Sequence, residues 1–398
     1  MDHPSQDLLR LRDFLHEHLT GDIIPFWLEH GVDPDGGINT CMRDDGSLVS
    51  RDKWQWSQWR AVWVFSKLYN EIEAKAEWLD FAEHIYRFNV HNGWDADAKA
   101  YVLCLGHDGQ VLRGYESVYA DGFAIYGMTE YAKASGLSEP LELARRTADC
   151  VLERLRSPHD KIPHFPYPIP KGARVHGIPM IFALVLWELG QFTDEDRYRE
   201  AALAMCDDIF AHFYRADRDL VLERIAVDNS EFPAPLGTAV VPGHVIEDMW
   251  FQIHIARDCG NRERIAEACR LTRRHLEFGW DSELGGLLLA RDADGRDEVG
   301  WEHHDTKLWW PHTEMLYATL IAYEHTREPW CLEWYDKTHD YSFSHYPNQD
   351  HGGWTQRLDR HGKPFTGTVA LPVKDPFHLP RALIYCLDVL DRLTAEQP

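Results

Sequence analysis

Apolar and polar residues follow a three-part pattern that occurs six times along the chain: a short Gly- and Asp-rich stretch, an apolar helical segment and a more polar helical segment. The short stretches lie at residues 33–47, 94–110, 157–170, 216–230, 280–295 and 350–363. Their spacing of roughly 55 to 70 residues indicates an internal repeat. DG, DN and HG turn signals predict that four of them are short two-stranded hairpins, whereas 157–170 is a Pro-rich variant.

Each short stretch is followed by an apolar helix, and the predicted starts are near Trp54, Val118, Pro179, His244, His312 and Pro380. Amphipathic helices such as 138–157 and 193–216 precede the stretches. Six inner and six outer helices predict an all-α fold, an (α/α)6 barrel, in one domain spanning residues 1–398, because no linker interrupts the series. An open α-solenoid is the alternative. We favour the closed barrel because the repeats share loop character and helix order but no side-chain consensus.

The composition narrows the possible partners. Forty-one Lys and Arg against 65 Asp and Glu give a net charge of −24, which repels phosphate backbones and anionic lipid headgroups. We therefore expect neither nucleic acid nor a membrane as a partner. No apolar leader opens the sequence and no run of eighteen apolar residues occurs, which predicts a cytoplasmic protein. The eight cysteines lack metal-ligand spacing and are expected to be reduced.

In a barrel of this kind all inner helices begin at the same end, so residues at the helix starts should meet at one rim. Several starts carry a proline in or just before the first turn, as in "HGIPMIF", "VPGHVIEDMWF", "WWPHTEML" and "PFHLPRAL". The rim residues expected from these starts are Gln58, Arg60, Tyr119, His244, Trp309, Trp310, His312 and His378. A pocket there would contain cations, aromatic rings and at least two imidazoles.

His244 and Glu247 lie one turn apart at one of these starts. The positive end of the helix dipole keeps an imidazole neutral, and a carboxylate one turn later acts in the opposite direction, so the pair suits a general base near neutral pH. His378 supplies a second base before another Pro-started helix. Two opposed bases suit removal of a proton from carbon on one face and its return on the other. Glycoside hydrolysis would instead require two carboxylates, for which Asp121 and Glu247 are the candidates.

Five segments resemble the signatures of the N-acylglucosamine 2-epimerase family: "WSQWRAVWVFSKLY", "PGHVIEDMWF", "KLWWPHTEMLYATLIAY", "GGWTQRLDRHGKP" and "DPFHLPRAL". The matches run in order from about residue 20 to 390. The resemblance implies an (α/α)6 barrel and proton transfer at C2 of a ring-opened sugar by His244 and His378. It also implies that Arg60 holds the C1 to C2 oxygens, that Glu247 supports His244, and that Trp310, with Trp309 behind it, forms a stacking wall.

Some residues of this chain differ from those that members of the resembling family carry at the matching positions. Gly177 and Ile181 stand where cellobiose epimerases carry asparagine and histidine, which favours the acylglucosamine branch, with His176 as a partial substitute. Asp375 and Pro376 replace smaller residues, which argues against recognition of an N-acetyl group.

Several polar residues have more than one possible role. His312 either contacts substrate or forms a hydrogen bond inside the barrel, and Arg381 either reaches the rim or fixes the last helix. Glu314 is expected to pair with a cation such as Lys307. "EHHD" at 302–305 lacks the helical spacing of metal ligands, and we predict no metal and no cofactor.

We therefore predict a sugar 2-epimerase or aldose-ketose isomerase that acts on a free-reducing monosaccharide of the N-acylglucosamine, N-acylmannosamine, mannose, glucose or fructose type. A glycoside hydrolase or lyase and a non-catalytic sugar- or protein-binding member of the fold are the alternatives. The outer helix faces allow a homodimer. Activity should fall below about pH 6 as the imidazoles become protonated.

Overall fold

The computed structural model describes residues 5 and 7–395 and is mostly helical. The chain folds into two compact units. The Arg60 unit comprises residues 26–207 and 370–377, and the His244 unit comprises the described residues of 1–25, 208–369 and 378–398. The expectation of a single domain stays a prediction.

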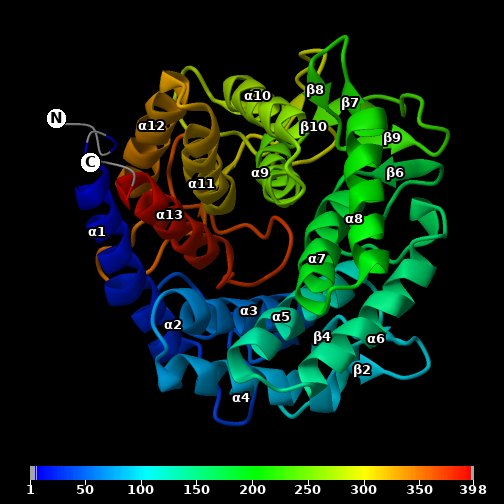
Figure 1. Ribbon diagram of the computed structural model, residues 1–398, viewed down its shortest axis with the longest axis vertical. Helices are drawn as coiled ribbons and strands as arrows, with labels where there is room; N and C mark the ends of the chain where they lie inside the picture. Colours follow the sequence, from blue (N-terminus) through cyan, green and yellow to red (C-terminus); the bar gives the residue numbers. More distant parts are fainter. Residues whose placement is uncertain (1–4, 6, 396–398) are drawn as a thin grey trace. The chain divides into compact units, whose positions relative to one another are not determined.

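Three apolar helices form the inner layer of the Arg60 unit, and α5 (Val118–Ser135) packs against both α3 (Gln55–Glu71) and α7 (Gly177–Thr193) (Figure 1). The more polar helices α4 (Ala76–Asn92) and α6 (Glu139–Arg154) pack on α3 and α5. Helix α8 (Asp196–Asp208) follows α7 along the chain and ends at the boundary of the unit.

The His244 unit repeats this arrangement, with α11 (Trp309–Thr326) packed against both α9 (Pro242–Asp258) and α13 (His378–Ala395). Three more helices cover these, α10 (Arg262–Gly279) on α9, α12 (Pro329–His345) on α11, and α1 (Leu8–His18) on α13 (Figure 1). A π-helical turn (Leu19–Ile23) and α2 (Ile24–His30) follow α1. All six predicted inner helices are confirmed, and each begins within three residues of its predicted start.

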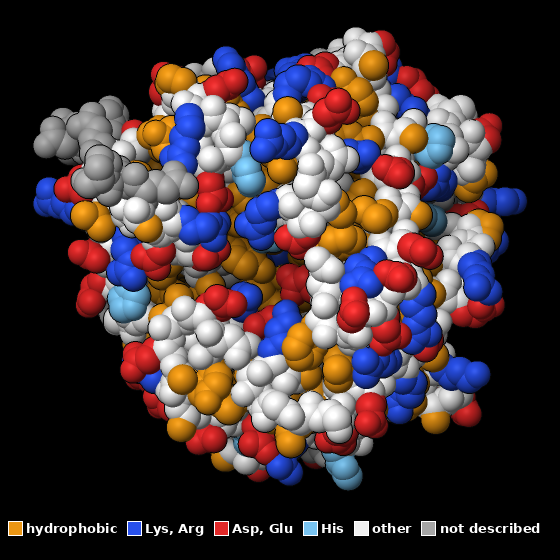
Figure 2. All heavy atoms as spheres, viewed as in Figure 1, with side chains coloured by type: hydrophobic (Ala, Val, Ile, Leu, Met, Phe, Trp, Pro, Cys, Tyr) orange, Lys and Arg blue, Asp and Glu red, His pale blue; other side chains and the backbone are white. Residues whose placement is uncertain are grey.

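Burial separates the inner helices from the outer ones as the sequence pattern predicts. In α5 every residue from Val118 to Ala132 is buried, whereas α10 buries one stripe that runs from Ile265 through Ala268 and Thr272 to Leu276. Figure 2 shows Lys and Arg side chains interspersed with Asp and Glu over one face of the molecule. Among the described residues, no helix combines the length and apolar character that a membrane span requires.

The strands are short and lie in the loops before the inner helices. They are β1 (Lys53–Trp54), β2 (Trp94–Asp95), β3 (Ala100–Tyr101), β4 (Cys104–Leu105), β5 (Val111–Arg113), β6 (Ala173–Val175), β7 (Tyr214–Arg215), β8 (Leu220–Val221), β9 (Arg224–Ala226), β10 (Ala239–Val240), β11 (Arg291–Asp292), β12 (Lys307–Leu308) and β13 (Arg357–Leu358). Antiparallel pairs or single bridges occur in or beside five of the six predicted stretches. The DG turn between β4 and β5 is closed by Gly109, whose φ of 83° a residue with a side chain rarely adopts. The Pro-rich stretch holds no strand among its residues, all of which the structure describes.

The fourth residue of three inner helices ties the helix to the loop backbone before or beside it. The three bonds are Ile38 N to Gln58 Oε1 at 2.8 Å, Tyr101 N to Asp121 Oδ1 at 2.8 Å, and Leu287 N to His312 Nε2 at 2.9 Å. These loops have few strand partners, so buried backbone N–H groups depend on side chains for hydrogen bonds. The polar fourth residues therefore hold the loops on the helix starts.

Candidate active site

The starts of α9, α11 and α13 meet at a cluster of three rings. His244 is the third residue of α9, Trp310 the second residue of α11 and His378 the first residue of α13. The Trp310 ring centroid lies 5.2 Å from that of His244 and 5.3 Å from that of His378, with interplanar angles of 30° and 36°. Both imidazoles therefore pack against the same indole, as the predicted convergence of these helix starts requires.

The α9 and α11 starts approach closely because Gly243 has no side chain. A Cβ atom added to Gly243 would lie 2.8 Å from Pro311 Cβ and 2.9 Å from Trp310 Cη2. Prolines are tolerated in these first turns because the first backbone N–H groups of a helix have no helical partner. The small residue and the prolines thus fix the position of the indole between the two histidines.

His244 is held by a carboxylate from a loop. Its Nδ1 lies 3.1 Å from Oε2 of Glu223, the residue directly before β9, and the His244 side chain is about 36% exposed. Burial lowers the pKa of His244, but the charge of Glu223 and the hydrogen bond to it, with a smaller contribution from Glu247, raise the pKa above its usual value. The expectation that Glu247 holds this ring is wrong, because Glu247 forms its hydrogen bond with Arg381.

His378 is held by a second carboxylate, which is more deeply buried. Its Nδ1 lies 2.7 Å from Glu314 Oε1, and the other oxygen of Glu314 accepts a hydrogen bond from Trp250 Nε1 at 2.8 Å. The Trp309 ring meets the imidazole of His378 edge to face at 5.9 Å. The expected pairing of Glu314 with a cation is confirmed, but the cation is Arg381, at 2.8 Å, and not Lys307. The Lys307 ammonium pairs with Asp281 at 3.3 Å.

Arg381 links the two acids of this cluster. Its Nη2 donates hydrogen bonds to Glu247 and, at 2.8 Å, to Glu314, and it lies 3.3 Å from His378 Nδ1. The Arg381 side chain is 2% exposed and stacks on Trp250 at 4.9 Å. Arg381 therefore positions the two acids beside His378, and its contact with substrate stays a prediction.

Glu247, Glu314 and His378 also form the one group among the described residues whose ligand atoms lie close enough together to hold a metal ion. The guanidinium of Arg381 already bonds to both carboxylates. A metal ion would have to displace this buried cation, so the donor set fits an ion-pair network better than a metal site.

The two histidines share one arrangement. Each ring directs Nδ1 at a carboxylate, which accepts the Nδ1–H, so Nε2 is the nitrogen that can exchange a proton with a ligand. A carboxylate on Nδ1 fixes the tautomer and orientation of an imidazole and stabilises the imidazolium after it takes a proton. The cluster therefore contains two oriented proton-transfer groups beside one aromatic wall.

Arg60 lies in the other unit, on α3, and is also enclosed. Its Nη1 lies 2.5 Å from Asp375 Oδ2, and its guanidinium carbon lies 4.0 Å from the ring centroid of Phe123, 4.9 Å from that of Phe377 and 5.2 Å from that of Trp56. The Arg60 side chain is 8% exposed. Stacked rings and a paired carboxylate fix the orientation of this cation.

Comparison with known proteins identifies the family. The family model for N-acylglucosamine 2-epimerase (GlcNAc 2-epimerase) matches residues 36–382. The chain belongs to this family. It is 29% identical to the N-acylglucosamine 2-epimerase of Mus musculus over 382 residues, which cover 93% of this chain and 90% of the mouse protein. The chain is thus a carbohydrate 2-epimerase or isomerase of the N-acylglucosamine 2-epimerase family.

Two solved structures share the fold of this family member. The cellobiose 2-epimerase of Spirochaeta thermophila aligns with a TM-score of 0.83 at 22% identity, over 97% of this chain and 98% of that one. A D-mannose isomerase aligns with a TM-score of 0.81 at 19% identity, over 96% and 97% of the two chains. These matches confirm the predicted (α/α)6 barrel fold.

Two residues that the sequence suggested as substrate contacts of this family member hold the loops. The side-chain amide of Gln58 forms hydrogen bonds with both N and O of Ile38, each at 2.8 Å. His312 accepts from Leu287 N through Nε2 and contacts Leu308 O at 2.7 Å through Nδ1, and burial lowers its pKa to about 3. Both side chains are fully buried, and their contact with substrate stays a prediction.

The remaining predicted residues lie at helix starts of the Arg60 unit. Tyr119 is 9% exposed and its hydroxyl lies 2.9 Å from His164 Nε2. His176 is fully buried directly before α7, and a Cβ atom on Gly177 would lie 2.6 Å from the Tyr119 hydroxyl. Contact of Tyr119 or His176 with a sugar stays a prediction.

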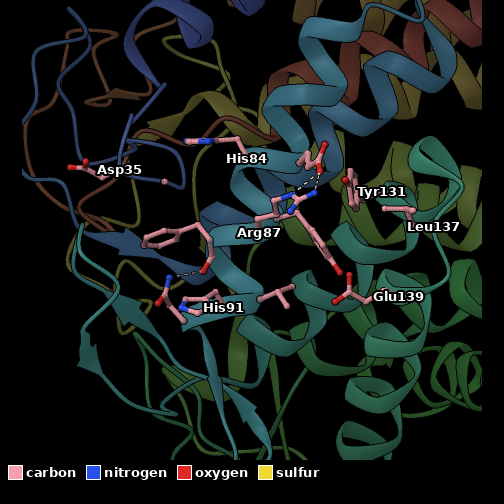
Figure 3. A pocket seen from close by; sticks show the side chains of 13 residues that line it. Asp35, His84, Arg87, His91, Tyr131, Leu137 and Glu139 are labelled. Carbon is pink, nitrogen blue, oxygen red and sulfur yellow. Dashed lines mark hydrogen bonds and ion pairs between the residues drawn. The ribbon is translucent and has the colours of Figure 1, made fainter.

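A surface hollow of about 590 Å³ lies along α4 and the start of α6 (Figure 3). Two ion pairs involve residues of its lining: Arg87 bonds to Glu83, and Asp35 bonds to Arg51. None of the predicted site residues lines it. The ring cluster at the starts of α9, α11 and α13, in which each of two imidazoles bonds to a carboxylate, is therefore the candidate active site.

Glu223 and Glu314 are the site residues that the sequence analysis missed as partners of the histidines. Glu223 lies 21 residues before His244, and Glu314 lies 64 residues before His378. No local spacing links either pair. Glu314 does follow the Trp-Trp-Pro helix start by one turn, and this position is the one signal that could have directed attention to it.

Proposed function

We propose that the protein transfers a proton at C2 of a free-reducing monosaccharide, with His244 and His378 as the two catalytic groups. The observation that carries this proposal is the pair of imidazoles, each held through Nδ1 by its own carboxylate and both packed against Trp310. Membership of a family of sugar 2-epimerases and isomerases supports it.

The reaction begins on the open-chain sugar. A neutral imidazole removes the C2 proton through Nε2, and the electron pair of the C2–H bond moves into the C1–C2 bond to give an enediolate. The other ring, as imidazolium, returns a proton from the opposite face of C2 to give the 2-epimer. Return of a proton to C1 gives the ketose instead: O2 loses its proton as the C2=O double bond forms, and O1 gains a proton to become a hydroxyl group. Each step places charge on groups that the carboxylates already orient.

Arg60 is proposed to hold the C1 and C2 oxygens, where negative charge develops. Its fixed guanidinium suits this charge because it needs no reorientation during the reaction. Trp310 is the wall against which the sugar chain lies. The cited relatives are named for N-acylglucosamine and D-mannose. We propose these two sugars as substrates, together with N-acylmannosamine, glucose and fructose, which proton transfer at C2 would interconvert with them.

Proton NMR in deuterated water tests this proposal, with mannose, glucose, fructose and N-acetylmannosamine offered separately. Solvent deuterium should enter at C2 of an aldose, and the product should distinguish a 2-epimerase from an aldose-ketose isomerase. His244→Ala and His378→Ala should each abolish exchange, whereas His361→Ala, at an exposed loop position, should leave it unchanged. Full exchange in either active-site variant would contradict the assignment.

Both candidate carboxylates of the glycoside hydrolase alternative form hydrogen bonds with neighbouring groups of the protein. Asp121 accepts hydrogen bonds from Tyr101 N and Arg154, and Glu247 bonds to Arg381. Both carboxylates are buried and serve neighbouring groups. A folded protein that binds these sugars without any deuterium exchange would instead favour the non-catalytic alternative.

A further inference from the structure

The segment of residues 370–377 is anchored in the Arg60 unit directly before Asp375. Lys374 donates its backbone N–H to Thr40 O at 2.7 Å, and its ammonium lies 3.0 Å from Asp44 Oδ1. Before Lys374, two apolar side chains of the segment join a buried cluster, whose members are Cys41, Trp54, Leu103, Cys104, Leu371 and Val373. The backbone that carries Asp375 is therefore fixed by packing and by hydrogen bonds.

The carboxylate of Asp375 is fixed as well. Its Oδ1 accepts a hydrogen bond from Phe377 N at 2.8 Å, and its Oδ2 accepts one from Arg60 at 2.5 Å. The two side chains are 15% and 8% exposed. The anion thus occupies one edge of the guanidinium, and Asp375 does not need to move to meet Arg60.

This arrangement places the negative charge of Asp375 directly beside the positive charge of Arg60. Aromatic rings cover the faces of the guanidinium, and Asp375 supplies a full negative charge at its edge. In a site shielded from water, charges interact more strongly than in bulk solvent. A ligand carboxylate brings its full charge to Arg60 on binding, so it gains the attraction of the cation but also meets the repulsion of Asp375. The charge on the C1 and C2 oxygens of the proposed reaction differs, because it develops only after a neutral sugar has bound. A hydroxyl group meets no such opposition, because it can donate to the carboxylate and accept from the guanidinium.

We propose that Asp375 determines specificity: it reserves the Arg60 end of the site for neutral hydroxyl- or carbonyl-bearing sugar ends and excludes sugars with a carboxylate there. This inference rests on the proposed function for the position of Arg60 at the C1 to C2 end of the substrate. Asp375 selects by charge, in addition to any steric limits of the site.

The test compares two six-carbon ligands that differ at C1, D-mannitol with a neutral C1 and D-mannonate with a C1 carboxylate. Isothermal titration calorimetry on the wild-type protein should show mannitol binding about tenfold or more tightly than mannonate. Asp375→Asn keeps the shape of the side chain and removes its charge. It should raise the affinity for mannonate about tenfold or more and change that for mannitol less than about threefold.

Asp44→Asn is the matched control, because it removes one negative charge and loosens the same segment through Lys374 without facing Arg60. It should leave the ratio of the two affinities unchanged. The wild-type comparison needs no variant, so the proposal remains testable even if Asp375→Asn folds poorly, which circular dichroism would show.

Tighter binding of mannonate than of mannitol by the wild-type protein would overturn the proposal. The same conclusion follows if folded Asp375→Asn gains no affinity for mannonate, or if Asp44→Asn changes the ratio equally. These results are separable from failure of the proposed function. If the protein exchanges deuterium at C2 but Asp375→Asn leaves the ratio of the mannitol and mannonate affinities unchanged, only the specificity role of Asp375 is refuted. If Asp375→Asn shifts this ratio but the protein exchanges deuterium on none of the sugars, only the catalytic proposal is refuted.

Discussion

Replacement of Gly243 by alanine should disturb catalysis more than stability, because this glycine sets the distance between the starts of α9 and α11. The added Cβ atom would lie 2.8 Å from Pro311 Cβ, 2.9 Å from Trp310 Cη2 and 3.0 Å from Pro311 Cγ. Carbon atoms pack best at about 3.5–4.0 Å. Either the helix starts must separate or Trp310 must move, by about 0.5–1 Å.

The two consequences have different sizes. Overpacking of this kind costs about 1–3 kcal/mol of folding free energy, and the better helix propensity of alanine offsets up to about 1 kcal/mol. The net loss of stability is therefore about 0–2 kcal/mol. Trp310 contacts both imidazoles of the proposed catalytic pair, and a misplacement of about 1 Å can cost about 100-fold in rate. We expect kcat of Gly243→Ala to fall about 10- to 100-fold.

The assay is the initial rate of deuterium incorporation at C2 over a range of sugar concentrations, with thermal unfolding followed in parallel. Gly114→Ala is the control, because no heavy atom lies within 4 Å of its added Cβ atom, and both rate and melting temperature should stay at the wild-type value. A kcat for Gly243→Ala within about twofold of wild type would refute the argument that Trp310 must stay where it is.

Three further predictions concern the carboxylates and the buried imidazole. Glu223→Gln removes the charge that raises the pKa of His244, so the limb of the pH-rate profile that belongs to His244 should move to lower pH. If the pH profiles of kcat/KM of Glu223→Gln and the wild-type protein coincide, the pairing of Glu223 with His244 is contradicted. Glu314→Gln should lower kcat about 100-fold or more with a smaller change in KM, and Glu314→Asp should recover part of it; an unchanged kcat would show that His378 needs no such support. His312→Ala should lower the free energy of unfolding by about 2–5 kcal/mol, measured by urea denaturation, but leave kcat of the folded protein intact, and a selective loss of kcat would support its substrate role.

The inner helices could be predicted because two local signals coincide at several of their starts, a proline in or near the first turn and a long apolar run after it. The same signals located His244, Trp310 and His378, whose positions in the first turn of three helices bring them to one end of the unit. The periodicity of apolar residues predicts which residues lie at the same end of a layer of helices. This prediction was correct where the path of the backbone alone decides the position of the residue.

The partners of these residues could not be predicted in this way. Glu223 comes from a loop and Glu314 from the second turn of another helix, and only the packing of α9, α11 and α13 brings them to the rings. The structural role of Gln58 and His312 could not be predicted from the sequence either. Both are polar residues at helix starts, but loops with few strand partners take up their hydrogen-bonding groups.

The raised pKa of His244 changes the expected pH dependence of the proposed reaction. The helix dipole alone predicts a neutral ring, but the charge of Glu223 opposes this and raises the pKa. Transfer through C2 requires one neutral ring and one imidazolium at the start of each direction, and the two rings exchange these states during turnover. The rate should therefore fall at low pH, where both rings are protonated, and also at high pH, where both are neutral. A ring with a raised pKa suits the imidazolium role near neutral pH. The limb of the pH-rate profile that moves in Glu223→Gln identifies the role of His244 in the direction of reaction assayed. A shift of the alkaline limb would show that His244 delivers the proton, and a shift of the acid limb would show that it removes the proton.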